Sequence, residues 1–130
     1  KEQGRFTDPM QDFGRLQNEM LRACRLVVDT GAHSKKWTRE QMIKYMLDNN
    51  PMRESEAIKE TERYIDNPAQ ALSYKVGMIK ILDLREKAKK ALGPKFDIRD
   101  FHDTVLKNGA VPLPILEELV DSYIAAKKSA

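Results

Sequence analysis

The chain has 130 residues, 41% of them hydrophobic and 33% charged, a composition typical of a folded soluble protein rather than a disordered one. Its length fits one domain, so we expect residues 1–130 to form a single helical domain. A net charge of only +3, with both signs scattered, argues against a nucleic-acid-binding protein, and no apolar run approaches the roughly 20 residues of a membrane-spanning helix.

Capping residues and helix-breaking residues divide the chain into about six predicted helices. The first opens at Pro9, and Gly31 is its expected end, because glycine readily adopts the left-handed conformation that terminates helices. The second opens at Thr38, which forms a capping box with Gln41, and ends before Pro51.

The remaining four helices are bounded in the same way. They start at Glu54 or Ser55, at Asn67-Pro68, at Asp97 and at Pro112 with Pro114, and the fourth and fifth stop at Gly93-Pro94 and Asn108-Gly109. We find no alternating strand pattern, and the connections are short. The fold class is therefore expected to be all-α, a compact bundle of orthogonal or antiparallel helices.

The fourth helix breaks its own pattern. Between residues 71 and 84 its apolar residues point almost all ways round, which predicts a central, buried helix. Yet its first turns carry Gln70, Tyr74 and Lys75, and buried polar groups are costly unless paired. Either these turns protrude into solvent, or the three side chains line a polar cavity.

A second unusual place is the segment from Asp29 to His33. Asp29 is expected in the last turn of its helix, where a negative charge is disfavoured by about 0.3–1 kcal/mol, so some partner should compensate. His33 could be this partner, and the carboxylate would then fix its tautomer. The alternative is an ordinary surface histidine.

The first helix also carries a stripe of charged residues: Arg15, Arg22, Arg25 and Asp29. One interpretation is a solvated face with an intrahelical pair between Glu19 and Arg22. The other is that the arginines bind a carboxylate, of a substrate or of a neighbouring domain, through their paired donors.

Complete catalytic motifs are missing from the sequence. The chain has two histidines, His33 and His102, far apart and without the glutamate spacing of a His-Glu-x-x-His zinc site. It has no glycine-rich phosphate loop and no Gly-x-Ser-x-Gly. We therefore expect that the chain alone is not an enzyme and holds no metal or cofactor.

Three segments resemble a known family: FGRLQNEMLRACRLVVDTGAH at 13–33, WTREQ at 37–41 and PAQALSYKVG at 68–77. They are similar to the C-terminal region of the bacterial family called domain of unknown function 885, and residues 96–103 and 112–113 fit the same region. Ala69 departs from the pattern, since the family usually has glycine there. The resemblance implies a fragment of a longer parent chain, the C-terminal part of a larger helical fold.

Full-length members of that family resemble zinc metallopeptidases of the gluzincin type, with the zinc motif upstream. The resemblance thus implies a parent that binds zinc and cleaves a peptide-like substrate. The partner of this chain would be the upstream zinc-binding part, and the chain would be inactive alone. Many members look secreted or lipid-anchored, which suggests the bacterial periplasm or cell envelope.

By analogy with related helical peptidases, His33 and Tyr74 would stabilise the oxyanion in the parent. Substrate contacts would come from a further set of residues on the first and fourth helices: Arg22, Arg25, Asp29, Gln70 and Lys75. The competing hypothesis is a non-catalytic helical domain for protein interaction or scaffolding.

Overall fold

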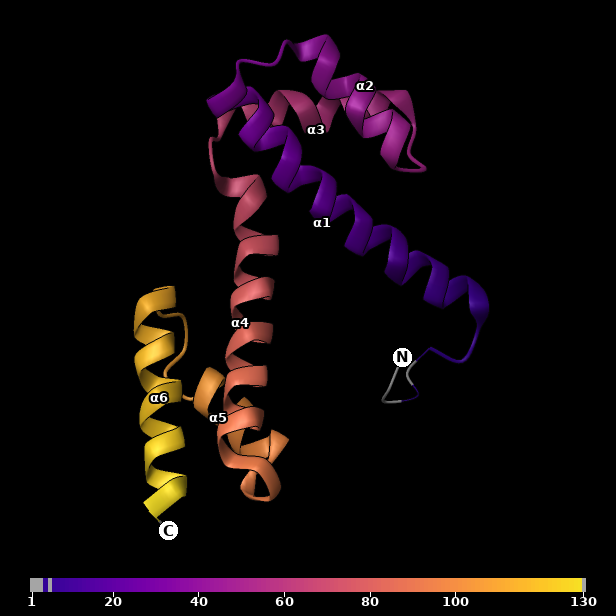
Figure 1. The fold of residues 1–130 in the computed structure, drawn as a ribbon. Helices are drawn as coiled ribbons and strands as arrows, with labels where there is room; N and C mark the ends of the chain where they lie inside the picture. The colour runs from indigo at the N-terminus through magenta and orange to yellow at the C-terminus, as the bar shows by residue number, and fades with distance from the viewer. Residues whose placement is uncertain (1–3, 5, 130) are drawn as a thin grey trace. The chain divides into compact units, whose positions relative to one another are not determined.

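The computed structural model describes residue 4 and residues 6–129, and in this part of the chain it is all-helical, as predicted. Six α-helices are joined by short connections, with no strand among the described residues (Figure 1). They are α1 (Pro9–Lys35), α2 (Arg39–Asn49), α3 (Glu54–Asp66), α4 (Gln70–Leu92), α5 (Ile98–Leu106) and α6 (Leu113–Ser129), with a short 3-10 turn at Gly93–Lys95.

The chain divides into two compact units, residues 1–76 and residues 77–130, and α4 runs from one into the other. We call them the first unit and the second unit. Two compact units can belong to one folding domain, so the single domain expected from the chain length stays a prediction.

In the first unit, α2 and α3 pack on each other and on the C-terminal half of α1 (Figure 1). The core consists of side chains from all three helices and from the start of α4: Cys24, Val28, Met42, Met46, Ala57, Tyr64 and Ala71. Each large apolar side chain buried here contributes about 1.5–3 kcal/mol. Cys24 is 2% exposed, and this burial raises the pKa of its thiol.

The predicted end of the first helix at Gly31 is wrong. The helix continues to Lys35, and Lys36 ends it in the left-handed region at φ 57°, with the Trp37 amide donating to the Gly31 carbonyl at 3.0 Å. A Cβ on Gly31 would lie 2.5 Å from Cε3 of Trp37. Glycine stands at this position because the indole packs against the helix backbone, and His33 consequently lies inside the helix.

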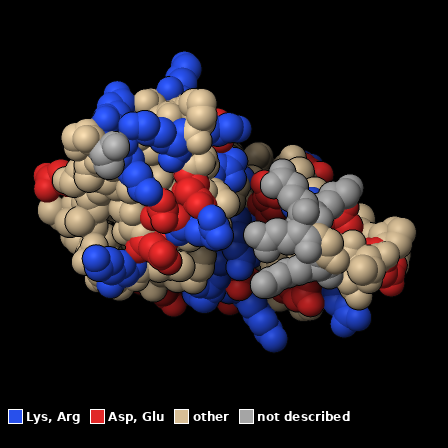
Figure 2. All heavy atoms as spheres, turned by 90° about the horizontal axis from the view of Figure 1, so that it is seen from below, with Lys and Arg blue, Asp and Glu red and all other residues tan. Residues whose placement is uncertain are grey.

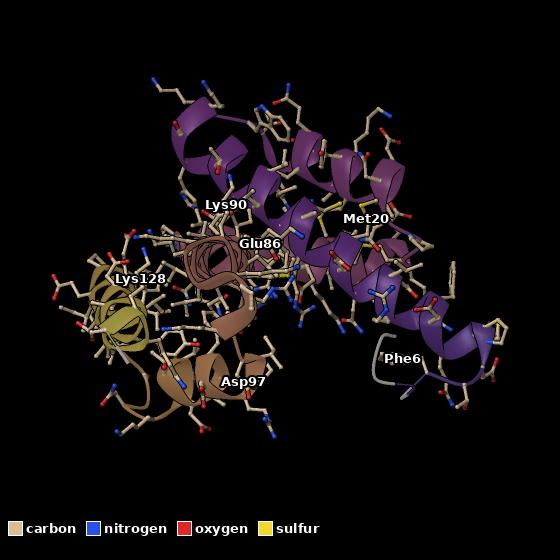
Figure 3. All side chains as sticks on the ribbon, turned by 60° about the horizontal axis from the view of Figure 1, so that its bottom comes forward. Phe6, Met20, Glu86, Lys90, Asp97 and Lys128 are labelled. Atoms are coloured by element: carbon tan, nitrogen blue, oxygen red, sulfur yellow. The ribbon has the colours of Figure 1, made fainter. Side chains whose placement is uncertain are left out.

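The helix starts are confirmed where a capping side chain was predicted. Thr38 accepts from the Gln41 amide at 3.2 Å, and the Gln41 side chain accepts from the Thr38 amide at 2.8 Å, which completes the capping box. Asp97, labelled in Figure 3, accepts from the Arg99 amide at 2.8 Å and opens α5. These interactions span two or three residues, so the local sequence suffices to predict them.

The prediction that α4 is buried all round is wrong for this chain. Val76, Ile79 and Leu82 are 38–43% exposed. Among the described residues of α4, four are buried, one in the core of the first unit and three in that of the second: Ala71, Leu84, Ala88 and Leu92. An apolar pattern identifies the residues that favour burial, but it does not establish that a neighbouring helix reaches them.

In the second unit, α6 lies beside the later part of α4, and α5 packs on α6 (Figure 1). The core is formed by Leu84, Ala88, Leu92, Phe101, Leu116, Val120 and Ile124. Lys87 on α4 forms ion pairs with Glu117 and Asp121 on α6, at 3.4 and 2.6 Å. These pairs connect the two helices at the edge of the apolar core.

The surface charge is mixed rather than segregated. On the face drawn in Figure 2, lysine and arginine side chains alternate with aspartate and glutamate. Among the described residues, no helix combines the length and the hydropathy needed to span a bilayer.

Candidate functional site

The first unit holds a group of arginine and tyrosine side chains from α1, α3 and α4. We define the arginine–tyrosine cluster as Arg22, Arg25, Glu60, Arg63, Tyr64, Gln70 and Tyr74. Four of these residues were predicted from the sequence to contact a substrate or its oxyanion. The structure places Tyr74 in contact with the other three, Arg22, Arg25 and Gln70.

Arg25 is the centre of the cluster. It is only 6% exposed, and its guanidinium carbon lies 4.7 Å from the ring centroid of Tyr74 and 5.5 Å from that of Tyr64. Such cation–π contacts are worth about 0.5–2 kcal/mol each, more where water is excluded. No carboxylate among the described residues forms an ion pair with Arg25, and its buried Nε has no hydrogen-bond partner there. The side chain is therefore a buried cation without a paired negative charge.

Gln70, in the first turn of α4, connects two arginines. Its Oε1 accepts from Arg25 Nη2 at 3.0 Å and from Arg63 Nη1 at 3.1 Å. Its Nε2 makes a long contact of 3.4 Å to the hydroxyl of Tyr74. Since the amide is neutral, it orients the two guanidiniums without cancelling their charge.

Glu60 supplies the one negative charge of the cluster. Its Oε2 accepts from Arg63 at 2.6 Å and from the Tyr64 hydroxyl at 2.5 Å. Burial raises the pKa of Glu60, but the hydrogen bonds from Arg63 and Tyr64 outweigh it, and the pKa is lowered. Burial and the bond to Glu60 raise the pKa of Tyr64, which keeps this hydroxyl a donor.

Tyr74 is the aromatic residue of the cluster that faces solvent, with 47% of its surface exposed. Its ring lies between two guanidiniums, since the Arg22 carbon is 5.5 Å from the centroid and Arg25 is closer still. Within the described part of the chain, the hydroxyl oxygen receives only the long contact from Gln70. Its proton is therefore available to a bound molecule.

Asp29 acts on the turn that precedes α4. It is 1% exposed, and its Oδ1 accepts from the Ala69 amide at 3.1 Å, while Oδ2 has no partner among the described residues. Ala69 has φ 68°, a conformation that favours glycine. The partner expected for Asp29 is thus a backbone amide.

Of the two alternatives for His33, the structure shows the exposed histidine and not the pairing with Asp29. His33 is exposed near the end of α1, and its Nε2 lies 2.9 Å from the carbonyl oxygen of Tyr64. Because a carbonyl can only accept, Nε2 must carry the hydrogen, and Nδ1 of the neutral ring is an acceptor. His33 is thus bound to the backbone of α3 rather than to the side chains of the arginine–tyrosine cluster.

The predicted pair between Glu19 and Arg22 is also wrong. Glu19 pairs instead with Arg15 at 3.2 Å and with Lys75 at 3.6 Å, and Arg22 donates to Asn18. At the start of α4, Tyr74 is exposed, in line with the solvent-exposed alternative, and Lys75 is half-buried; the polar cavity stays a prediction.

Sequence reasoning missed Glu60, Arg63 and Tyr64. Their spacing of three and four residues places them on one face of a helix, a signal that could have identified them.

The residues that the structure describes do not fit a zinc site. No group of three or more His, Cys, Asp or Glu side chains that could hold a metal exists among the described residues. In addition, the one histidine near the arginine–tyrosine cluster already donates Nε2–H to a carbonyl.

A comparison with protein families identifies the family of this chain. Residues 1–120 match the family described as "Bacterial protein of unknown function (DUF885)". A crystal structure of a protein proposed to be a lipoprotein, from Colwellia psychrerythraea, is 54% identical with a TM-score of 0.94. That match covers 96% of this chain and only 22% of the related one, so the chain spans about a fifth of its length. No curated protein matches the chain. The chain belongs to the DUF885 family.

Proposed function

We propose that this chain supplies a substrate-binding wall of a zinc-dependent, peptidase-like hydrolase, and that it is inactive alone. The zinc part of the proposal rests on the resemblance of the family to gluzincin-type peptidases. Since the described residues do not fit a metal site, the zinc ligands would lie elsewhere in the protein. That a related chain is more than four times as long is compatible with this division, since 96% of this chain covers 22% of it.

The observation that carries the proposal is the hydroxyl of the exposed Tyr74, whose ring contacts the buried guanidinium of Arg25. A hydroxyl donor beside fixed positive charge stabilises an oxyanion that develops on a peptide carbonyl. Gln70 holds Arg25 at 3.0 Å, so little reorganisation is needed when the negative charge appears. In this proposal, Tyr74 is the principal oxyanion donor.

His33 has a conditional role. Its Nε2–H is used by the Tyr64 carbonyl, so it can donate to an oxyanion only through Nδ1, in the doubly protonated form. Asp29 is a positioning residue, because its bond to the Ala69 amide fixes the turn from which Gln70 and Tyr74 follow. Two further residues would contact the substrate: Arg22 and Lys75.

The test is a Tyr74→Phe substitution in the full-length protein that contains this chain. We expect turnover of a peptide substrate to fall by about 10²–10³, as for loss of an oxyanion donor, with zinc content unchanged. Tyr45→Phe is the matched control, since the Tyr45 hydroxyl forms no hydrogen bond with the described residues, and it should leave turnover unchanged. Unchanged turnover in Tyr74→Phe would refute the assignment.

The second candidate is a non-catalytic helical domain for protein interaction. It is favoured by the apolar side chains along the N-terminal half of α1, which are 49–71% exposed: Met10, Phe13, Leu16 and Met20, the last labelled in Figure 3. Absence of both zinc and hydrolysis in the full-length protein would favour this candidate.

We also propose a location in the cell envelope, because the related structure belongs to a protein proposed to be a lipoprotein. Cell fractionation followed by immunoblotting tests this, and recovery with cytoplasmic markers would contradict it.

A further inference from the structure

We infer that the arginine–tyrosine cluster binds a free carboxylate, and that the substrates are therefore peptides with a free α-carboxyl group within reach of this site. That the bound carboxylates belong to substrates rests on the proposed function. The predicted binding itself does not depend on turnover. Its basis is a positive charge that the described residues leave without a counter-ion.

The charge imbalance is local. The cluster contains three guanidiniums, those of Arg22, Arg25 and Arg63, and one carboxylate, Glu60. A second buried carboxylate, Asp29, lies one helical turn from Arg25 and accepts from the Ala69 amide, so positive charge still exceeds negative charge here. Glu60 forms its ion pair with Arg63 and interacts with Arg25 only at longer range, so neither Arg25 nor Arg22 has an ion pair among the described residues. A buried cation is costly until an anion reaches it, so an incoming negative group is favoured at this place.

The donors also converge. Arg25 Nη2 and Arg63 Nη1 both point at one oxygen, Oε1 of Gln70, at 3.0 and 3.1 Å. That oxygen marks a position at which two guanidiniums already bind an acceptor. A carboxylate presents two acceptor oxygens and a full charge, which is the group that arginine recognises most strongly.

Donors remain free for such a ligand. Arg25 donates only through Nη2, and Arg22 only through Nη1 to Asn18, within the part of the chain that the structure describes. The hydroxyl of Tyr74 adds a neutral donor beside them, and its exposed ring offers an apolar surface to the residue that bears the carboxylate.

The experiment compares two probes on the full-length protein, N-acetyl-dialanine and its C-terminal amide, by isothermal titration calorimetry. They differ only in the negative charge. We expect the acid to bind between about tenfold and a hundredfold more tightly, the range for one hydrogen bond to a charged group. The preference should shrink as salt is added, because the exposed end of the site is screened.

Arg63→Gln is the deciding variant, because the Arg63 side chain is 41% exposed and the substitution should not unfold the protein. It should reduce the preference for the acid to less than about threefold. Arg39→Gln is the control: Arg39 is an arginine of the same unit with the same side-chain exposure, in an ion pair with Glu62 at 2.5 Å outside the cluster. That variant should retain the full preference.

Equal affinity for acid and amide would overturn the inference, and so would a preference that Arg63→Gln leaves intact. Binding of neither probe would also overturn it, and would indicate that an acidic side chain elsewhere in the protein neutralises the arginines. A preference for the acid without any hydrolysis would sustain the carboxylate site and refute the hydrolase. Hydrolysis that Tyr74→Phe reduces, together with equal affinities for the acid and the amide, would support the hydrolase and refute the carboxylate site.

Discussion

Gly31→Ala tests the close packing at the end of α1, where the side chain would meet the Trp37 ring. The new methyl group would lie 2.5 Å from Cε3 and 2.6 Å from Cδ2 of the indole, well inside contact distance. Overpacking of this kind costs about 1–3 kcal/mol. Alanine recovers about 1 kcal/mol of helix propensity, since Gly31 is inside the helix. We therefore expect a net loss of about 0–2 kcal/mol in the free energy of unfolding.

The control separates the two contributions. Gly14 lies in the same helix, and a Cβ there would meet nothing within 4 Å. Gly14→Ala should therefore stabilise the protein by about 0.5–1 kcal/mol. Urea unfolding followed by circular dichroism gives both values, and Trp37, the single tryptophan, reports the first unit by fluorescence.

The difference between the two alanine variants isolates the steric cost, which we expect to be about 1–3 kcal/mol. Equal stabilisation by Gly31→Ala and Gly14→Ala would refute the reasoning, because it would mean that the indole moves aside freely. In a Trp37→Leu background, Gly31→Ala should become stabilising.

Two further predictions concern titration. Because burial and Glu60 raise the pKa of Tyr64 above its ordinary value of 10.0, the unfolded chain loses this proton first, so stability should fall as the pH rises above 10. Tyr64→Phe should show a smaller fall in urea unfolding over the same range, and an equal fall would contradict the assignment. In the second unit, hydrogen bonds from the side chain and the backbone of Arg99 lower the pKa of Asp97 to about 2. The stability that the ionised Asp97 contributes is therefore present above pH 3.8 and is lost as the pH falls towards 2. An NMR titration should find this pKa for Asp97, and a clearly higher pKa for Asp97 in the Arg99→Gln variant. An unchanged Asp97 pKa in that variant would exclude the Arg99 side chain as the cause.

The candidate site was predictable in part. Arg22, Arg25, Gln70 and Tyr74 were identified because each breaks a local rule, either a charged stripe on a helix or polar residues at the start of an apolar one. Their mutual contacts were not predictable, since they join residues about 45 positions apart. The third helix was missed for the same reason, because nothing local connects it to Arg25.

Predictions based on local chemistry were the most reliable. The helix starts at Thr38 and Asp97 depend on hydrogen bonds between residues two or three positions apart, and the structure confirms both. The Gly31 stop failed because a residue six positions further on packs against that glycine and makes it useful inside the helix. Helix propensity alone does not predict such a contact, because it depends on a side chain outside the helix.

The sequence by itself determined the helical class, most helix boundaries and the residue types available for chemistry, because capping, periodicity and charge act over a few residues. Only the tertiary structure decided which charges are buried and which are paired. It placed Arg25 against two tyrosines and an amide, gave Asp29 a backbone partner, and bound His33 to a carbonyl. The physical reason is that desolvation and pairing depend on neighbours from other helices, and no local pattern specifies those neighbours.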